Sequence, residues 1–287
     1  MSQIIESAPR SFRVGIECFK KGKVVKGTKK IEASFKSGFK PAMLLLDLVG
    51  HESNANEAIA SFEVLMGKSL SDAFFAIGKM YYEGNDRLFS REASVKWFLE
   101  SAREGGALAC NYIGQMRENG NGLPLDMKKA FEWYERGAER GDIVAKYNIG
   151  RLLRTGDGGY KDLNEAVDNF YESAKGGYGP AMYQAGQIFE QGLTVPVKLN
   201  KAFDWYLKAA KAGYVQAYEK VGLFLFEGKG TEKKESEAFE WFSKIDDNIS
   251  ADIALMLGKI YLEGLGTEKD FSKAKEYLEQ ASHNDLV

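Results

Sequence analysis

The chain has 287 residues and carries 39 lysines and arginines against 41 aspartates and glutamates, a formal net charge of −2 at pH 7. Such a balance gives no bias towards nucleic acid or an acidic membrane surface, and no apolar run approaches the roughly 20 residues that span a bilayer. The first residues lack a basic stretch followed by an apolar one, so we expect no secretory signal. Two cysteines, Cys18 and Cys110, are expected to be buried free thiols, which favours a reducing cytoplasm.

The N-terminal part of the chain is read as a short tail over residues 1–7 followed by a degenerate helix-turn-helix unit. In this unit Gly15 and Cys18 occupy core positions of the first helix, and the lysine-rich segment 20–30 is expected to be a loop. The core of its second helix is expected near Ala33 and Phe35.

A second degenerate unit is expected to complete residues 8–70. The sequence PAMLLLDLVGH supplies its first helix and EAIASFEVLMG its second, but the unit is short. End units of a repeat array commonly deviate because one face has no neighbour; a short unit inside the array is less expected and predicts a local change of curvature near residue 70.

From Ser71 onwards the sequence repeats every 36 residues. Two series of glycines keep this spacing: Gly78, Gly114, Gly150, Gly186, Gly222 and Gly258, and then Gly84, Gly120, Gly156, Gly192, Gly228 and Gly264. Aromatic columns keep it too: Trp97, Trp133, Trp205 and Trp241, and then Phe98, Tyr134, Phe170, Tyr206 and Phe242. A fixed period of this size predicts a stack of small units, here about eight in one solenoid over 1–287, of which six regular ones occupy 71–287.

Each regular unit is predicted to hold two helices. The first helix ends at the second glycine, where a residue without Cβ reaches positive φ without strain. The second helix starts after a residue that can cap its free N–H groups: Ser90, Asp126, Asp162 or Asp270. Its buried stripe follows the i, i+3, i+4, i+7 spacing of an α-helix, as in Ala202, Trp205, Tyr206 and Ala209.

These columns resemble the Sel-1-like repeat, which is similar to the tetratricopeptide repeat. The resemblance covers about four-fifths of the chain and is carried in one unit by Ala181, Gly186, Phe189, Gly192, Lys201, Ala202, Trp205, Tyr206, Ala209, Ala210 and Gly213. It implies an all-α, right-handed superhelix whose concave face binds another protein. Members are mostly adaptors, some are bacterial immunity proteins that neutralise a toxin, and a few cysteine-rich ones have been linked to β-lactam binding.

The residues offer little for catalysis. The two histidines, His51 and His283, stand at opposite ends of the solenoid and are not expected to share a metal site. HExxH, CxxC, GxSxG and phosphate-loop motifs do not occur, so we expect no enzyme, metal or cofactor. The basic residues Arg151 and Arg154 and the segment 20–30 are local patches, and a nucleic-acid partner is not expected.

A partner is expected on the stripe of each first helix that the core columns leave unused. Its predicted contact residues are Phe75, Lys79, Tyr82, Asn111, Gln115, Tyr147, Arg151, Arg154, Tyr183, Gln187 and Phe226. Aromatic residues and arginines are typical interface anchors, although such aromatics also cover neighbouring helices. A second apolar strip contains Leu223, Phe226, Leu255 and Leu262. It is open to a partner, to weak homodimerisation or to cover by the C-terminal tail.

One residue departs from the pattern. Arg117 stands in a core column where other units have Tyr81, Leu153, Phe189, Leu225 and Tyr261. Either its stem is buried and its charged head reaches the surface, or this unit contains a local polar site.

The sequence therefore predicts a non-catalytic binding protein of a bacterial cytoplasm that holds a protein or peptide in its concave groove. An immunity protein or inhibitor directed at a toxin or effector and a signalling adaptor both remain open, and both come from the resemblance. The competing hypothesis is an enzyme or binder that acts on a cell-wall or β-lactam compound.

Overall fold

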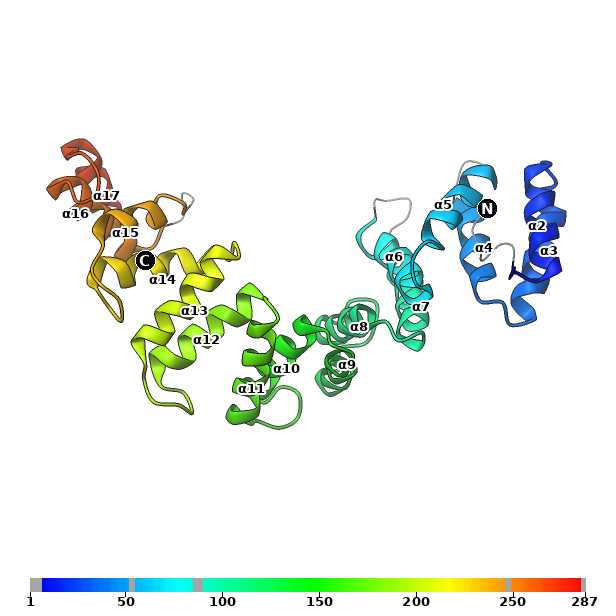
Figure 1. Cartoon of the computed structure of the whole chain (residues 1–287), viewed down its shortest axis with the longest axis horizontal. Helices are drawn as coiled ribbons and strands as arrows, with labels where there is room; N and C mark the ends of the chain where they lie inside the picture. Colours follow the sequence, from blue (N-terminus) through cyan, green and yellow to red (C-terminus); the bar gives the residue numbers. More distant parts are fainter. Residues whose placement is uncertain (1–6, 52–54, 85–89, 246–248, 285–287) are drawn as a thin grey trace. The chain divides into compact units, whose positions relative to one another are not determined.

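The computed structural model describes residues 7–51, 55–84, 90–245 and 249–284, and in these residues it contains sixteen helices and no strand (Figure 1). The predicted all-α class is confirmed. The chain divides into two compact units, Met1–Gly141 and Asp142–Val287, and each is described by itself. That all units form one solenoid stays a prediction.

Helices of both units form successive hairpins. The first unit contains α2 (Arg10–Lys20), α3 (Val24–Lys36), α4 (Pro41–His51), α5 (Ala55–Leu65), α6 (Leu70–Glu83), α7 (Arg91–Arg103), α8 (Ala107–Asn119) and α9 (Met127–Glu139). The second contains α10 (Ile143–Thr155), α11 (Leu163–Lys175), α12 (Gly179–Gln191), α13 (Leu199–Lys211), α14 (Gln216–Glu227), α15 (Glu235–Phe242), α16 (Ala251–Glu263) and α17 (Phe271–Asn284). The most extensive packing joins the two helices of a hairpin, as in α12 and α13.

The helix ends follow the predicted chemistry. Glycines in the left-handed conformation end the first helices α8, α10, α12, α14 and α16, at Gly120, Gly156, Gly192, Gly228 and Gly264. Among the first helices of the six regular repeats, α6 differs, because Gly84 has a φ of −64°. Ser90, Asp126, Asp162 and Asp270 each accept a hydrogen bond from a backbone N–H of the second helix. The predicted caps are therefore confirmed.

The first glycine column makes room for the aromatic column 20 residues later. A Cβ at Gly114 would lie 2.5 Å from the Tyr134 ring, and a Cβ at Gly222 would lie 2.3 Å from the Phe242 ring. The same close approach occurs between Gly78 and Phe98, Gly150 and Phe170, Gly186 and Tyr206, and Gly258 and Leu278. The two sequence columns are thus the two sides of one contact inside each hairpin.

The tryptophan column is less buried than the sequence predicts. Trp97 is buried, but Trp205 is half-buried although Ala202, Tyr206 and Ala209 beside it are fully buried. The Lys208 ammonium lies over the Trp205 ring, 4.3 Å from the ring centroid. The ring therefore packs against Tyr171 of α11 and is also covered by a long basic side chain.

Two expectations for the N-terminal unit are wrong. The segment 20–30 is not a loop, because α3 already begins at Val24. Gly27 packs inside the hairpin, where a Cβ would lie 2.4 Å from the Phe19 ring, so this glycine permits helix packing and marks no turn. The core positions of α3 are Gly27, Ile31 and Ser34, one helical turn apart, whereas Ala33 and Phe35 are exposed.

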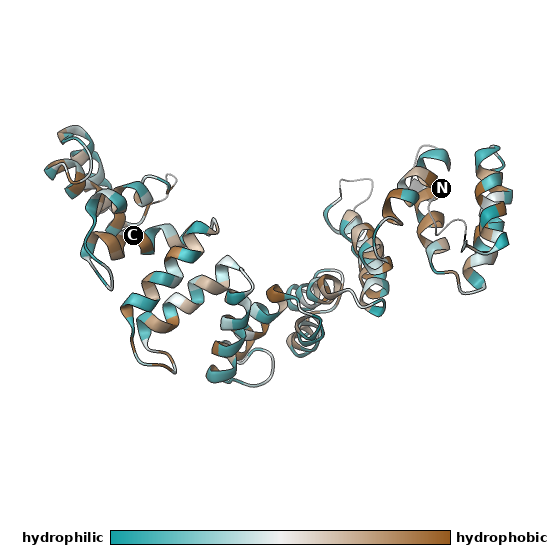
Figure 2. Cartoon of the chain, in the orientation of Figure 1, coloured by the Kyte–Doolittle hydropathy of each residue, from teal (hydrophilic) through white to brown (hydrophobic). Residues whose placement is uncertain are grey.

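Apolar residues concentrate in the next hairpin. In Figure 2, α4 and α5 are mostly coloured as hydrophobic, whereas α2 and α3 are mostly hydrophilic. Leu44, Leu45 and Phe62 are fully buried in a core that also contains Phe12 and Phe74. The degenerate helices therefore share one core with the regular hairpin that follows them.

Candidate partner-binding surface

The first unit places two predicted anchors in an aromatic cluster. Phe75 and Tyr82 of α6 contact Tyr112 of α8 with ring centroids 5.2 and 5.6 Å apart, and both also contact Phe98. The Arg91 guanidinium lies 4.2 Å from the centroid of the Tyr82 ring. Phe98 is fully buried, whereas Phe75, Tyr82 and Tyr112 are half-buried, so these three cover neighbouring helices and also expose part of their rings.

The other predicted residues of the first unit differ in exposure. Lys79 is exposed and forms an ion pair of 3.5 Å with Glu83, and Gln115 is half-buried. Asn111 is only 4% exposed. Asn111 therefore offers almost no surface to a partner, because it is buried within α8.

The second unit brings four tyrosines together, which we call the tyrosine row: Tyr147, Tyr178, Tyr183 and Tyr214. Tyr147 of α10 contacts Tyr178 with ring centroids 5.2 Å apart, and Tyr183 of α12 contacts Tyr214 at 5.5 Å. Tyr147 and Tyr183 also rest on buried rings of the second helices, Phe170 and Tyr206. All four are half-buried, so their rings are fixed but reachable.

The hydroxyl groups of this row influence one another. Burial raises the pKa of Tyr178, and the nearby Tyr147, Tyr214 and Asp142 raise it further. Burial also raises the pKa of Tyr214, with contributions from Tyr147 and Tyr183. Burial and then Glu219 raise the pKa of Tyr183. The phenols of Tyr178, Tyr183 and Tyr214 therefore stay neutral at physiological pH and act there as hydrogen-bonding groups.

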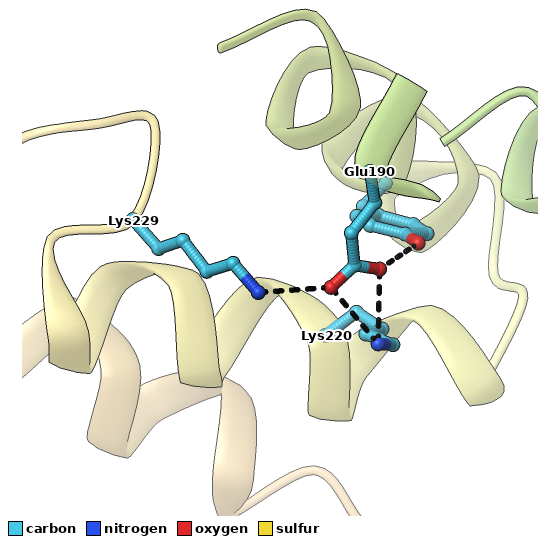
Figure 3. Close-up of polar contacts among 4 residues, drawn as sticks. Glu190, Lys220 and Lys229 are labelled. Atoms are coloured by element: carbon cyan, nitrogen blue, oxygen red, sulfur yellow. Dashed lines mark hydrogen bonds and ion pairs between the residues drawn. The ribbon is translucent and has the colours of Figure 1, made fainter. Parts of the chain in front are cut away.

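A carboxylate beside the row holds three partners (Figure 3). Glu190 of α12 accepts a hydrogen bond of 2.6 Å from the Tyr206 hydroxyl, and the ammonium groups of Lys220 and Lys229 each lie 3.0 Å from it. Its side chain is only 14% exposed. Burial opposes its ionisation, but the hydrogen bonds from Tyr206, Lys220 and Lys229 outweigh this and lower the pKa of Glu190.

The preceding repeat has a different pair at the same positions. Arg154, 36 residues before Glu190, donates a hydrogen bond of 2.9 Å to Gln184, 36 residues before Lys220. Arg151 and Gln187 are half-buried beside these pairs. The repeats thus keep the contact between neighbouring first helices and vary its charge.

The apolar strip near the C-terminus is divided. Leu223 and Phe226 of α14 are half-buried and pack against the core of the second unit, whereas Leu255 and Leu262 of α16 are 37% and 42% exposed. Residues 285–287, which form the end of the tail that could cover the strip, lie outside the described residues.

Arg117 combines a partly buried stem with a head that reaches a loop. Its Nη1 donates a hydrogen bond of 3.2 Å to the Pro124 carbonyl oxygen, and its Nε is buried without a hydrogen-bond partner. The guanidinium therefore ties α8 to the loop before α9, and this geometry favours the first of the two explanations that the sequence left open.

Sequence reasoning missed Tyr112 in the first unit, and in the second unit it missed Tyr178, Gln184, Tyr214, Lys220 and Lys229. A signal existed for Tyr178 and Tyr214, because they stand 36 residues apart at the ends of two repeats. The predicted stripe lies on the first helices only, whereas both tyrosines precede those helices.

Candidate groups for catalysis are scarce in the described part of the chain. Among the described residues, no three His, Cys, Asp or Glu side chains are placed to hold a metal ion. The side chains of His51 and His283 lie outside those described. Both cysteines are buried and free, as predicted. In the ranges that the structure describes, no helix is long and apolar enough to cross a membrane.

The hairpins agree with a family comparison. The model of the Sel1 repeat matches residues 71–106, 107–142, 143–178, 179–214, 215–245 and 252–286. The chain belongs to the Sel1 repeat family. Sel1 repeat proteins mediate protein–protein interactions, and their fold is typically non-catalytic. No curated protein matches the chain.

Solved structures show the same fold. A Sel1 repeat protein from Oxalobacter formigenes is 23% identical with a TM-score of 0.66, over 89% of this chain and 99% of that one. The protective antigen c5321 of uropathogenic Escherichia coli strains is 22% identical with a TM-score of 0.57, over 96% of this chain and 69% of that one. The immunity protein Pa5087 from Pseudomonas aeruginosa is 17% identical with a TM-score of 0.46, over 76% and 83%. These similarities concern the fold, and the last is too weak to carry an argument.

Proposed function

We propose that this Sel1 repeat protein is a non-catalytic binding protein that holds a protein partner on the first-helix surface of its second unit. The observation that carries the proposal is the tyrosine row. Its four rings are half-buried and form two contacting pairs, Tyr147 with Tyr178 and Tyr183 with Tyr214. Tyrosine offers a large contact area and a hydrogen-bonding group with few rotatable bonds, which is why it is frequent at interface anchors.

The polar groups around the row support the same function. Arg154 is held by Gln184, and Glu190 is held by two lysines and Tyr206. Because these side chains are already ordered by each other, a partner that binds there loses little additional side-chain freedom. The charged groups differ between these neighbouring repeats, with Arg154 beside a neutral Gln184 in one and Glu190 between two lysines in the next. Such a difference favours one orientation of a partner over others.

Two classes of partner fit this proposal. An immunity protein or inhibitor would hold a compact toxin or effector domain with high affinity, whereas an adaptor would hold a short extended peptide more weakly. No observation in the described residues favours the alternative of an enzyme or binder acting on a cell-wall or β-lactam compound, so we do not propose it.

Site-specific photo-crosslinking tests the proposal. A photoreactive amino acid is placed at Gln187, beside the tyrosine row, and in a second protein at Asn200, which is exposed on α13. Both proteins are expressed in the source organism and irradiated, and the adducts are identified by mass spectrometry. We expect one specific protein to be trapped from position 187 and not from position 200; equal trapping at both positions, or none at either, would overturn the proposal. The folded size of the trapped protein then separates the inhibitor from the adaptor.

A further inference from the structure

A pocket of about 340 Å³ lies on the second helices of the first unit, apart from the surface described above. Its wall consists of Leu99, Ala102 and Arg103 of α7, together with Trp133 and Arg136 of α9 and the following Arg140. Half of the lining residues are thus arginines, and the others are apolar.

The arginines are oriented but incompletely neutralised. Arg140 Nη1 donates to the Ala102 carbonyl oxygen at 2.9 Å and to Cys110 Sγ at 3.0 Å, and neither group is a carboxylate. The Arg136 guanidinium lies 4.6 Å from the centroid of the Trp133 ring. Within the described ranges, only Arg103 of these three forms an ion pair, with Glu100. Among the described residues, the guanidinium groups of Arg136 and Arg140 therefore have no carboxylate partner.

We propose that this pocket binds an acidic peptide segment of a second protein partner, with a carboxylate on the arginines and an adjacent apolar side chain on Leu99 and Trp133. Arginine donates two parallel hydrogen bonds to a carboxylate, and a guanidinium that is already oriented loses less freedom in doing so. The exposed part of Trp133 supplies the apolar contact that a peptide side chain needs.

The charge distribution favours a peptide over a nucleic acid. The chain has a net charge of −2, and affinity for nucleic acid rests on many phosphate contacts along a basic track. A cluster of three arginines in one pocket matches one or two carboxylates. The site is also independent of the tyrosine row, because its residues all belong to the other unit.

Fluorescence anisotropy with defined probes tests this inference on the full chain. The first probe is a labelled, capped peptide with two acidic residues on each side of one phenylalanine; the second replaces each acid by its amide; the third is a labelled single-stranded oligonucleotide. We expect saturable binding of the acidic peptide and binding of its amide counterpart that is weaker by about tenfold or more.

Paired variants identify the site. Arg136→Gln is expected to weaken binding of the acidic peptide by about tenfold. Its control is Lys208→Gln, because Lys208 occupies the equivalent place over Trp205 but has no arginine cluster beside it, and this change should leave binding within about twofold. Circular dichroism melts confirm that both variants are folded.

Three results would overturn the inference. In the first, the acidic and amide peptides bind equally, or neither binds at about 1 mM. In the second, Arg136→Gln and Lys208→Gln change the affinity for the acidic peptide equally. In the third, the oligonucleotide binds better than the acidic peptide and loses its affinity in Arg136→Gln. The last result would assign the pocket to nucleic acid. None of these results bears on the tyrosine row.

Discussion

The ring of Tyr206 occupies the space that a side chain at Gly186 would need. A Cβ added at Gly186 would lie 2.5 Å from the Tyr206 ring, which is fully buried between α12 and α13. The hydroxyl of the same tyrosine donates to Glu190 on α12. One residue of the second helix thus fixes both the spacing of the hairpin and a carboxylate of the proposed surface.

Gly186→Ala is predicted to destabilise the second unit by about 1–3 kcal/mol, because a backbone and a buried ring must move apart. The control is Gly50→Ala in α4, where an added Cβ meets no atom within 4 Å; there the alanine should be neutral or stabilising by up to about 1 kcal/mol. Urea unfolding followed by circular dichroism measures both changes. Equal effects of the two substitutions would show that the Gly186 contact is looser than the structure indicates.

Glu190→Gln is predicted to lower the free energy of unfolding at pH 7 by about 1–3 kcal/mol, because Lys220, Lys229 and Tyr206 lose a charged acceptor. Since the pKa of Glu190 is lowered from 4.5 in the folded protein, its stabilisation is complete above about pH 4.5 and disappears as the pH falls through the folded pKa. The difference between wild type and variant should therefore shrink in acid.

The matched control for this change is Glu227→Gln, since Glu227 is exposed at the end of α14. It should alter stability by no more than about 0.5 kcal/mol. A difference between wild type and Glu190→Gln that stays constant from pH 7 to below the folded pKa would contradict the assigned role of the carboxylate.

Asp142 is predicted to show the opposite pH dependence. Its Oδ1 caps α10 through the N–H groups of Val144 and Ala145, but its Oδ2 is buried without a hydrogen-bond partner. Burial raises the pKa of Asp142 from 3.8 in spite of those two hydrogen bonds. The folded protein therefore binds this proton more tightly than the unfolded chain, and the contribution of Asp142 to stability increases as the pH falls through its folded pKa.

Two substitutions separate the cap from the charge. Asp142→Asn keeps an acceptor for the cap and removes the buried charge, so it should be neutral or stabilising at pH 7, and this advantage should fade in acid. Asp142→Ala removes the cap and should cost about 1 kcal/mol. Thermal melts between pH 3 and 8 provide the measurement; equal losses for both variants at pH 7 would mean that the charge itself is needed.

Arg117→Leu is predicted to retain the fold. Its free energy of unfolding should either increase or decrease by no more than about 1 kcal/mol. The leucine restores the apolar residue of the column and removes the buried, unpaired Nε, at the loss of the hydrogen bond to Pro124. Differential scanning calorimetry measures the stability of Arg117→Leu, which loses the positive charge, and of Arg117→Lys, which keeps it. A loss above about 2 kcal/mol in Arg117→Leu alone would instead point to a local polar site.

The regular hairpins could be predicted from the sequence because the same pair of columns, a glycine and a bulky residue 20 positions later, occurs in all six repeats. Gly186 and Tyr206 belong to two columns whose contact is geometrically obligatory, so periodicity alone identifies both. In the N-terminal hairpin of α2 and α3, which lacks the regular repeat, the segment 20–30 was wrongly predicted to be a loop, because Gly27 serves close packing against Phe19.

The surface was harder to predict than the core. Tyr147 and Tyr183 could be found from their place on the first helices, but Tyr178 and Tyr214 approach from the connecting segments, and only their contacts reveal the row. Asn111 has a surface position in the pattern and is nevertheless buried. Helical phase gives the direction of a side chain but not the neighbour that covers it.

The affinity of the trapped partner for surface variants is the most direct test of the proposed function. The two proteins to compare are Gln187→Arg, which places a bulky charge beside the tyrosine row, and Asn200→Arg, which places the same charge on α13. Isothermal titration calorimetry with the purified partner should show a dissociation constant about tenfold or more weaker for Gln187→Arg and unchanged for Asn200→Arg, with equal melting temperatures. Unchanged affinity in Gln187→Arg, or an equal loss in both proteins, would contradict binding on the first-helix surface.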